Sequence, residues 1–167
     1  MSTDLPDAAL DEHDALYLRR AIELSAHAAG RGNRPFGSVV VSGAGTVLCE
    51  AWNDNAETGD CTGHAEVNAL RIASKANPRE ALAGATVYAS GEPCVMCAGA
   101  IFWSGVRRVV FGLNAVRLRS FRTLQAGAGD LEMSCREVFA ASPQPFEVIG
   151  PALAEEATAP HTAYWTR

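Results

Sequence analysis

Hydrophobic positions in the first third of the chain follow two different periods. Spaced leucine and isoleucine residues among charges and alanines over residues 9–29 predict an amphipathic helix that ends at Gly30-Arg31-Gly32. Two short apolar runs, 37–41 and 46–52, then flank the glycine-containing segment 42–45. This pattern predicts a hairpin of two antiparallel strands.

The middle of the chain alternates between strand and helix patterns. Helices that separate strands are typical of crossover connections, which bring the carboxyl ends of the strands to one edge of the sheet. Such sheets bind their ligands at that edge. The predicted elements are a helix from His64 to about Ala76 that Asn77-Pro78 stops, a strand over 86–89, a helix over 94–103 and a strand over 107–111.

The last part of the chain is long enough for one more crossover. The interval from 112 to 145 accommodates a helix, so a strand over 146–149 is expected to run parallel to its predecessor. Residues 151–156 predict a short helix, and 159–167 a loop-like tail. We therefore expect a single α/β domain over residues 1–167, with residues 1–8 flexible.

Composition and charge narrow the class of protein. The 48% hydrophobic content supports a full core, and the net charge of −5 arises from five acidic residues among the first fourteen. The sequence has no stretch that predicts a signal peptide or a membrane helix, and its odd number of cysteines, 5, suits a reducing compartment. We expect a cytoplasmic protein that binds neither membranes nor, given this charge, nucleic acid.

The motif with most chemical content is His64-Ala65-Glu66, followed later by Pro93-Cys94-Val95-Met96-Cys97. One imidazole and two thiolates are three of the four ligands of a tetrahedral zinc ion, which leaves a position for a water that the metal acidifies. Glu66 is then the catalytic acid and base, because a carboxylate beside the metal can carry protons without being a ligand. Its alternative role is to stabilise the helix N-terminus electrostatically.

Cys61 offers an alternative interpretation of this metal site. It lies three residues before His64, so the four residues could close the coordination sphere around a structural zinc. Structural zinc usually stabilises domains too small for a core, which this chain is not. We therefore favour an open catalytic site that holds one Zn²⁺ per chain.

From Arg34-Pro35-Phe36-Gly37 through Gly112 the sequence resembles the cytidine deaminase superfamily, in its guanine, cytosine and tRNA adenosine deaminase branch. The resemblance implies a three-layer fold with a mixed five-stranded sheet between helices, and a homodimer. It also implies that Asn53 and the backbone N–H of Ala65 bind the base. Taken alone, Asn53 is equally typical of a turn at a strand end.

Aromatic residues suggest the shape of the substrate. Phe36 and Trp103 match aromatic positions of the guanine deaminases, although such residues alone more often belong to a core. His161, Tyr164 and Trp165 crowd the tail, which by the same resemblance closes over the site; packing on the outside of the domain is the alternative. Departures from the family pattern are Cys61, Gly63 and the segment after Gly112.

Two enzymatic functions and one non-enzymatic function remain. The favoured function is hydrolytic deamination of a free nucleobase or related amino-heterocycle, of the guanine, isocytosine, cytosine or aminotriazine type. The second is tRNA adenosine deamination. An arginine run from Arg107 to Arg122 would serve this function by following a phosphate backbone; the alternative is that these arginines form a solvated face and pair with carboxylates elsewhere in the chain. The third is a structural-zinc interaction module.

Overall fold

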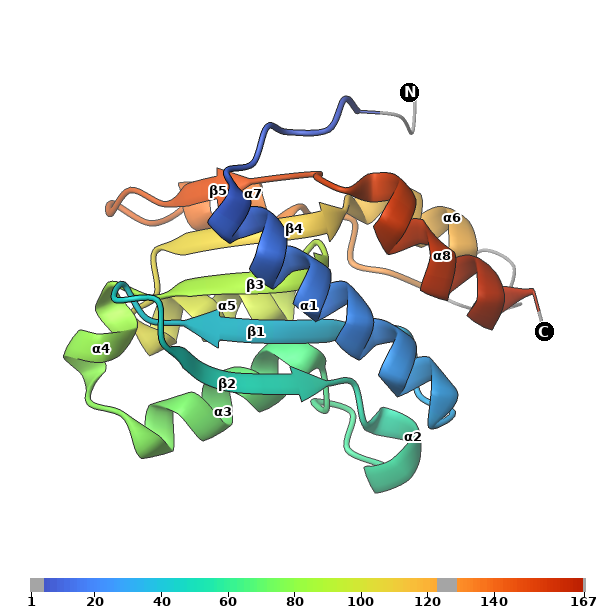
Figure 1. The fold of residues 1–167 in the computed structure, drawn as a ribbon, viewed down its shortest axis with the longest axis horizontal. Coiled ribbons are helices and arrows are strands. Elements are labelled where there is room, and N and C mark those ends of the chain that lie inside the picture. The colour runs from blue at the N-terminus through green and yellow to red at the C-terminus, as the bar shows by residue number, and fades with distance from the viewer. Residues whose placement is uncertain (1–4, 123–128, 167) are drawn as a thin grey trace.

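The computed structural model describes residues 5–122 and 129–166. Its centre is a five-stranded sheet with the strand order β2-β1-β3-β4-β5 (Figure 1). Strand β1 pairs antiparallel with β2 and with β3, whereas β3, β4 and β5 are parallel. The sheet is therefore mixed, as expected. The strands are β1 (Gly37–Val41), β2 (Val47–Trp52), β3 (Thr86–Gly91), β4 (Arg108–Leu113) and β5 (Glu147–Ile149).

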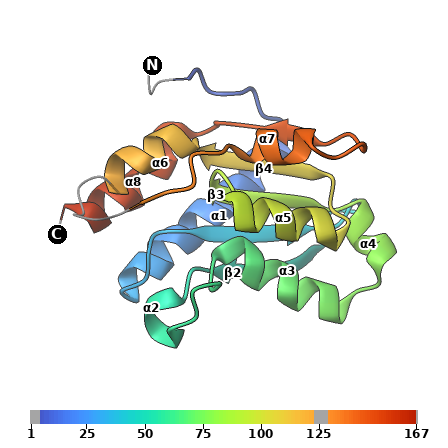
Figure 2. The same cartoon turned by 180° about the vertical axis from the view of Figure 1, so that it is seen from behind.

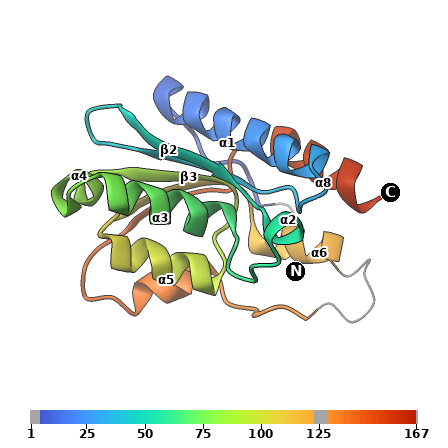
Figure 3. The same cartoon turned by 90° about the horizontal axis from the view of Figure 1, so that it is seen from below.

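Helices cover both faces of the sheet and complete three layers (Figure 3). One face carries α1 (Glu12–Gly30) and α8 (Ala154–Trp165). The opposite face, which Figure 2 shows from the front, carries α3 (Ala65–Ala76), α5 (Val95–Ser104) and α7 (Cys135–Ala140). The remaining helices are α2 (Asn55–Thr58), α4 (Arg79–Ala83) and α6 (Ala115–Arg122). Among the described residues, no helix combines the length and the apolar character that a membrane crossing requires.

The predicted hairpin and the parallel pairing of the last strands are confirmed. The connection through α3 differs in detail from a simple crossover, because it joins β2 to β3 and these two strands have β1 between them. Gly37 allows this central strand to lie close under α1: a Cβ at this position would come 2.2 Å from the carbonyl oxygen of Ala21. The two strands that lead to α3 and α5 still end at the same edge (Figure 1).

The prediction of a short helix over 151–156 followed by a loop-like tail is wrong. Helix α8 runs from Ala154 to Trp165 with Pro160 inside it. A proline lacks the N–H of a helical hydrogen bond and disfavours a helix interior. Burial of Ala157 and His161 against the rest of the domain overrides this local preference. Residue 167 of the predicted tail lies outside the described residues.

Part of the N-terminal segment that was expected to be flexible is bound to the start of α8. The N–H of Ala8 donates to the carbonyl of Pro151 at 2.7 Å, and the carboxylate of Asp7 accepts from the N–H of Ala154 at 3.2 Å. Residues 1–4 lie outside the described residues. The described part of this segment therefore adds contacts to the α8 layer.

Asp14 connects helix α1 to the two central parallel strands. Its carboxylate accepts hydrogen bonds from Tyr88 on β3 at 2.7 Å and from both Nη atoms of Arg108 on β4, at 2.8 and 2.6 Å. The residue is only 4% exposed. The Arg108 guanidinium holds the pKa of Asp14 below its usual value, so the ionised form stabilises the fold.

Replacement of Asp14 by asparagine should destabilise the protein by about 3 kcal/mol at pH 7, because it leaves the Arg108 charge without its buried partner. Because the folded pKa is lowered, the stabilisation is complete above the unfolded pKa of about 3.9 and is lost as the pH falls through the folded value. Urea unfolding of both proteins at several pH values measures this difference. The exposed pair of Arg19 and Glu156 provides the control: Glu156→Gln should cost less than about 1 kcal/mol. An equal loss for both variants would contradict the assignment.

Candidate metal centre and active site

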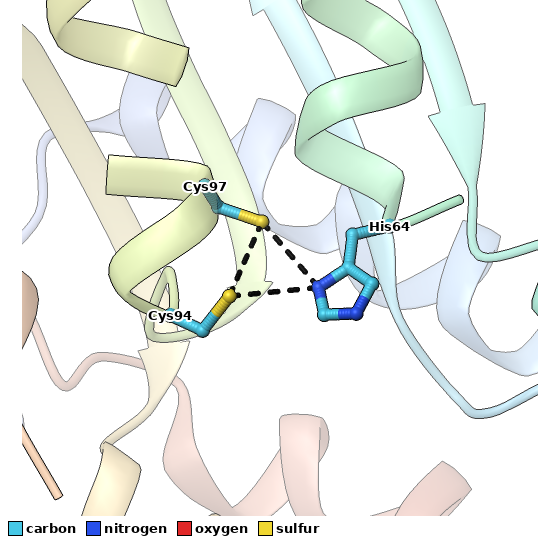
Figure 4. A group of neighbouring side chains, drawn as sticks. All are labelled: His64, Cys94 and Cys97. Carbon is cyan, nitrogen blue, oxygen red and sulfur yellow. Dashed lines mark hydrogen bonds between the residues drawn. The ribbon is translucent and has the colours of Figure 1, made fainter. Parts of the chain in front are cut away.

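The three predicted metal ligands meet at the edge of the sheet where β2 and β3 end (Figure 4). His64 Nδ1 lies 3.6 Å from the Sγ of Cys94 and 3.5 Å from the Sγ of Cys97. The two sulfur atoms are 3.6 Å apart. Among the described residues these three side chains form the group that could hold a metal ion.

This triangle has the dimensions that zinc requires. Zinc–sulfur bonds of about 2.3 Å and zinc–nitrogen bonds of about 2.0–2.1 Å in a tetrahedron place two sulfurs about 3.8 Å apart and a sulfur and a nitrogen about 3.6 Å apart. The distances in this structure agree with those values to about 0.2 Å. One imidazole and two thiolates are also a donor set that zinc prefers. The residues therefore fit a zinc ion.

The positions of the ligands follow from the starts of two helices. His64 is the N-cap residue of α3 and Cys94 that of α5, and neither side chain makes the usual capping hydrogen bond. Both side chains are thus free to turn toward a metal. The hydrogen bond between the Cys94 and Cys97 sulfurs lowers the pKa of Cys94 to about 4, which favours the thiolate that zinc binds.

Glu66 stands in the first turn of α3, beside the ligands. It is 4% exposed, and one of its carboxylate oxygens lies 3.4 Å from the Cys97 sulfur. Burial raises the pKa of its carboxyl group. The carboxyl group therefore lies beside the metal position in an environment that favours proton uptake.

A small cavity of about 40 Å³ opens in front of these residues. Asn53 is 1% exposed and lies at the cavity wall, where its carboxamide donates to Asn55 Oδ1 at 2.6 Å. Ala65 is buried at the first position of α3, where a backbone N–H has no partner within the helix. The cavity is lined by Arg34, Phe36, Asn53, His64, Glu66, Glu92, Cys94 and Arg122.

Trp103 does not reach this cavity in the same chain. It lies near the end of α5, whereas the metal ligands lie at its start, and it is 77% exposed. Its ring contacts that of Phe102 edge-on, with centroids 5.0 Å apart. Of Phe36 and Trp103, the two residues that match aromatic positions of the guanine deaminases, Phe36 lines the cavity and Trp103 does not.

The last turns of α8 do approach the site. The buried ring of His161 contacts Phe36 edge-on at 5.0 Å between centroids and accepts a hydrogen bond from the indole N–H of Trp165 at 3.4 Å. Tyr164 lines a wider groove of about 410 Å³ next to the cavity, together with Arg34, Asn53 and His64. Because His161 belongs to the core, the end of α8 is a fixed helical wall of the site rather than a loop. The same part of the helix carries Tyr164, which lines the groove.

Cys61 is exposed and lines the same groove, outside the group of three ligands. Asp54 holds the end of the loop that carries Cys61, because the Asp54 N–H donates to the carbonyl of Gly63 at 3.1 Å; the Oδ1 of Asp54 accepts from Asn68 at 2.9 Å. A Cβ on Gly63 would come 2.3 Å from that oxygen, so this departure from the family pattern makes room for the Asp54 carboxylate.

The sequence interpretation did not assign Glu92, Arg34 or Arg122 to the site. Glu92 precedes the Pro93-Cys94 pair, and its two oxygens accept from the N–H groups of Ala115 at 2.7 Å and Cys135 at 3.1 Å. It thus ties the metal-binding turn to the starts of α6 and α7. Its place directly before the cysteine motif could have drawn attention to it, whereas no local signal marks the two arginines.

The arginine run does not form one basic surface. Arg107 donates to the carbonyl of Phe102 and to Gln144, and Arg108 pairs with Asp14 and Glu147. Arg122 pairs with Asp130 and lines the cavity. For these three arginines the alternative interpretation is confirmed, because each has a partner within the fold.

Comparison with known proteins agrees with the fold and the motif. Residues 11–113 match the cytidine and deoxycytidylate deaminase zinc-binding region. A probable cytosine deaminase of Schizosaccharomyces pombe is 40% identical over 156 residues, which are 93% of this chain and 94% of that protein. A tRNA-specific adenosine deaminase of Haemophilus influenzae is 42% identical over 103 residues, or 62% of this chain and 60% of that protein.

Among solved structures, a guanine deaminase from Nitrosomonas europaea superimposes with a TM-score of 0.77 at 21% identity, covering 99% of this chain and 90% of that one. At this identity the likeness shows the fold alone. The matched region contains His64, Glu66, Cys94 and Cys97. The chain belongs to the zinc-dependent cytidine and deoxycytidylate deaminase family, whose members are hydrolytic deaminases.

Proposed function

We propose that this deaminase acts on a free nucleobase or a related amino-heterocycle, of the guanine, isocytosine, cytosine or aminotriazine type. The observation that carries the proposal is the small cavity that Glu66, two of the metal ligands and Asn53 line together with Phe36. The ring of His161 packs against Phe36 and closes one wall of this cavity, which favours a compact planar substrate over a polymer.

Each residue has a role in this reaction. His64, Cys94 and Cys97 hold the zinc ion, which when bound supplies the Lewis acidity that makes water a nucleophile near neutral pH. Glu66 moves the protons. Asn53 offers both a donor and an acceptor to the edge of the ring, and the N–H of Ala65 offers a second donor.

The proton balance requires a single carboxylate that acts more than once. The water oxygen bonds to the carbon that bears the amine, and the bond between this carbon and the amine nitrogen breaks. Glu66 takes the protons of water, delivers one to the ring nitrogen and the other to the departing amine, and is regenerated. The products are the oxo-heterocycle and ammonia.

A tRNA substrate has less support. RNA binding by this chain would need a basic surface for the phosphates, and Arg107, Arg108 and Arg122 have partners within the fold. The match to the tRNA-specific adenosine deaminase of Haemophilus influenzae covers 62% of this chain, whereas the match to the probable cytosine deaminase covers 93%.

We also infer that two copies associate through the exposed face of α5. Met96 and Trp103 are two helical turns apart on this helix and are 36% and 77% exposed, and a large exposed apolar side chain such as Trp103 is typical of an interface. Trp103 would then serve assembly rather than base stacking in its own chain.

Glu66→Gln should keep the fold and the zinc but lower the deamination rate by about 10²–10⁴-fold or more, because an amide cannot carry protons. Ammonia release from a panel of free bases measures the rate, and elemental analysis measures zinc. Glu80→Gln removes an exposed carboxylate on α4 and should leave both unchanged. Turnover near that of the wild type in Glu66→Gln would exclude Glu66 as the proton carrier.

Free bases should be better substrates than their nucleosides, by roughly tenfold or more in kcat/KM, because Phe36 and the His161 ring packed on it form a flat aromatic wall that suits a planar base better than a ribose. Guanine compared with guanosine, and cytosine with cytidine, gives the ratio directly. The same assay should include tRNA as a substrate. Preference for nucleosides or for tRNA would reject the proposed substrate class.

Trp103→Glu should convert the dimer to a monomer, because it places a charge in an apolar contact. Sedimentation velocity at micromolar concentration measures the state. Leu131→Glu changes another apolar residue, 72% exposed and outside α5, and should leave the dimer intact. A wild-type protein that sediments as a monomer would refute this interface.

A further inference from the structure

Two arginines face the active-site cavity with hydrogen-bonding capacity to spare. Arg34 is exposed at the mouth of the cavity and of the neighbouring groove, and its guanidinium forms no hydrogen bond or ion pair within the described residues. Arg122 donates Nη1 to Asp130, but its buried Nε has no partner among the described residues. The guanidinium carbon of Arg122 lies 5.9 Å from the centre of the Phe36 ring.

The carboxylates that line the same cavity are engaged elsewhere. Both oxygens of Glu92 accept backbone N–H groups, at 2.7 and 3.1 Å, and Glu66 faces Cys97. Neither forms an ion pair with Arg34 or Arg122 within the described residues. The guanidinium of Arg34 is therefore available to a ligand, and Arg122, which pairs with Asp130, still offers its unpartnered Nε.

His161 adds to the excess of donors around Phe36. The indole N–H of Trp165 can only donate, so His161 Nδ1 accepts, and the neutral imidazole carries its proton on Nε2. Burial lowers the pKa of His161 to about 4, so the ring is neutral at pH 7. The Nε2 of His161 and the Nε of Arg122 are both buried, and neither has a hydrogen-bond partner among the described residues. Both unpartnered donors belong to residues that contact Phe36. The described residues around Phe36 therefore offer more hydrogen-bond donors than acceptors.

We propose that the substrate is an amino-heterocycle that carries an anionic oxygen, such as a ring carboxylate, and that Arg34 and Arg122 bind this oxygen. Guanidinium groups bind carboxylates through short, charge-assisted hydrogen bonds, which are strongest where water is partly excluded. Arg122 lines the same small cavity as Glu66, so the anion belongs on the ring itself rather than on a distant sugar phosphate. The inference rests on the proposed deamination and specifies its substrate class.

Binding of product-like probes tests this inference without turnover. Uracil-5-carboxylate and uracil-6-carboxylate, each with its neutral carboxamide, are titrated into the zinc-loaded protein in a calorimeter. At least one carboxylate should bind roughly tenfold more tightly than its carboxamide at low salt, as expected for a hydrogen bond to a charged group. This preference should decrease as the salt concentration rises.

Arg34→Gln should remove most of that preference and leave carboxamide binding unchanged. Arg122→Lys, which keeps the charge but loses Nε, should reduce it, with the melting temperature as a check on folding. The matched control is Arg79→Gln, which removes one charge from exposed α4 and should change neither affinity.

Equal affinity for carboxylate and carboxamide in the wild type would overturn the inference, as would an Arg34→Gln variant that weakens both alike. A preference for uridine 5′-monophosphate over uridine, without a preference for either ring carboxylate, would also overturn it, by assigning the arginines to a phosphate. These measurements use binding, whereas the Glu66→Gln assay uses turnover. Failure of the anion site and failure of the deaminase proposal are therefore distinguishable.

Discussion

The structure depends on one geometric constraint, that helices α3 and α5 begin at the same edge of the sheet. Their N-cap residues, His64 and Cys94, are thereby brought within 3.6 Å of each other although thirty residues separate them. Both side chains face the metal position instead of capping their helices. Helix N-termini also favour negative charge, which suits the thiolates that zinc binds.

The other elements hold this edge and close it. Asp14 ties α1 to β3 and β4, the strands that precede and follow the cysteine motif in the chain. Glu92 connects that motif to the starts of α6 and α7, and α8 places His161 behind Phe36. The result is a small enclosed cavity around Glu66, in which polar groups are fixed before a substrate arrives.

Features with local signals could be predicted from the sequence. The glycine turn indicated the hairpin, Asn77-Pro78 marked the end of α3, and the spacing of His64, Cys94 and Cys97 indicated the metal site. Features set by distant contacts could not. Helix α8 continues through Pro160 because its buried side chains pack on the sheet layer, and Arg122 reaches the cavity because α6 follows β4 at the same edge. Trp103 matched a family position in sequence, but its helix turns it outward.

The central claim is that three protein ligands hold the zinc and leave a position for chemistry. X-ray absorption at the zinc edge of the zinc-loaded protein tests it most directly, because sulfur and lighter ligands scatter differently. We expect two sulfur neighbours per zinc, at about 2.3 Å, from Cys94 and Cys97. Three sulfur neighbours would mean that Cys61 closes the site, and would contradict it.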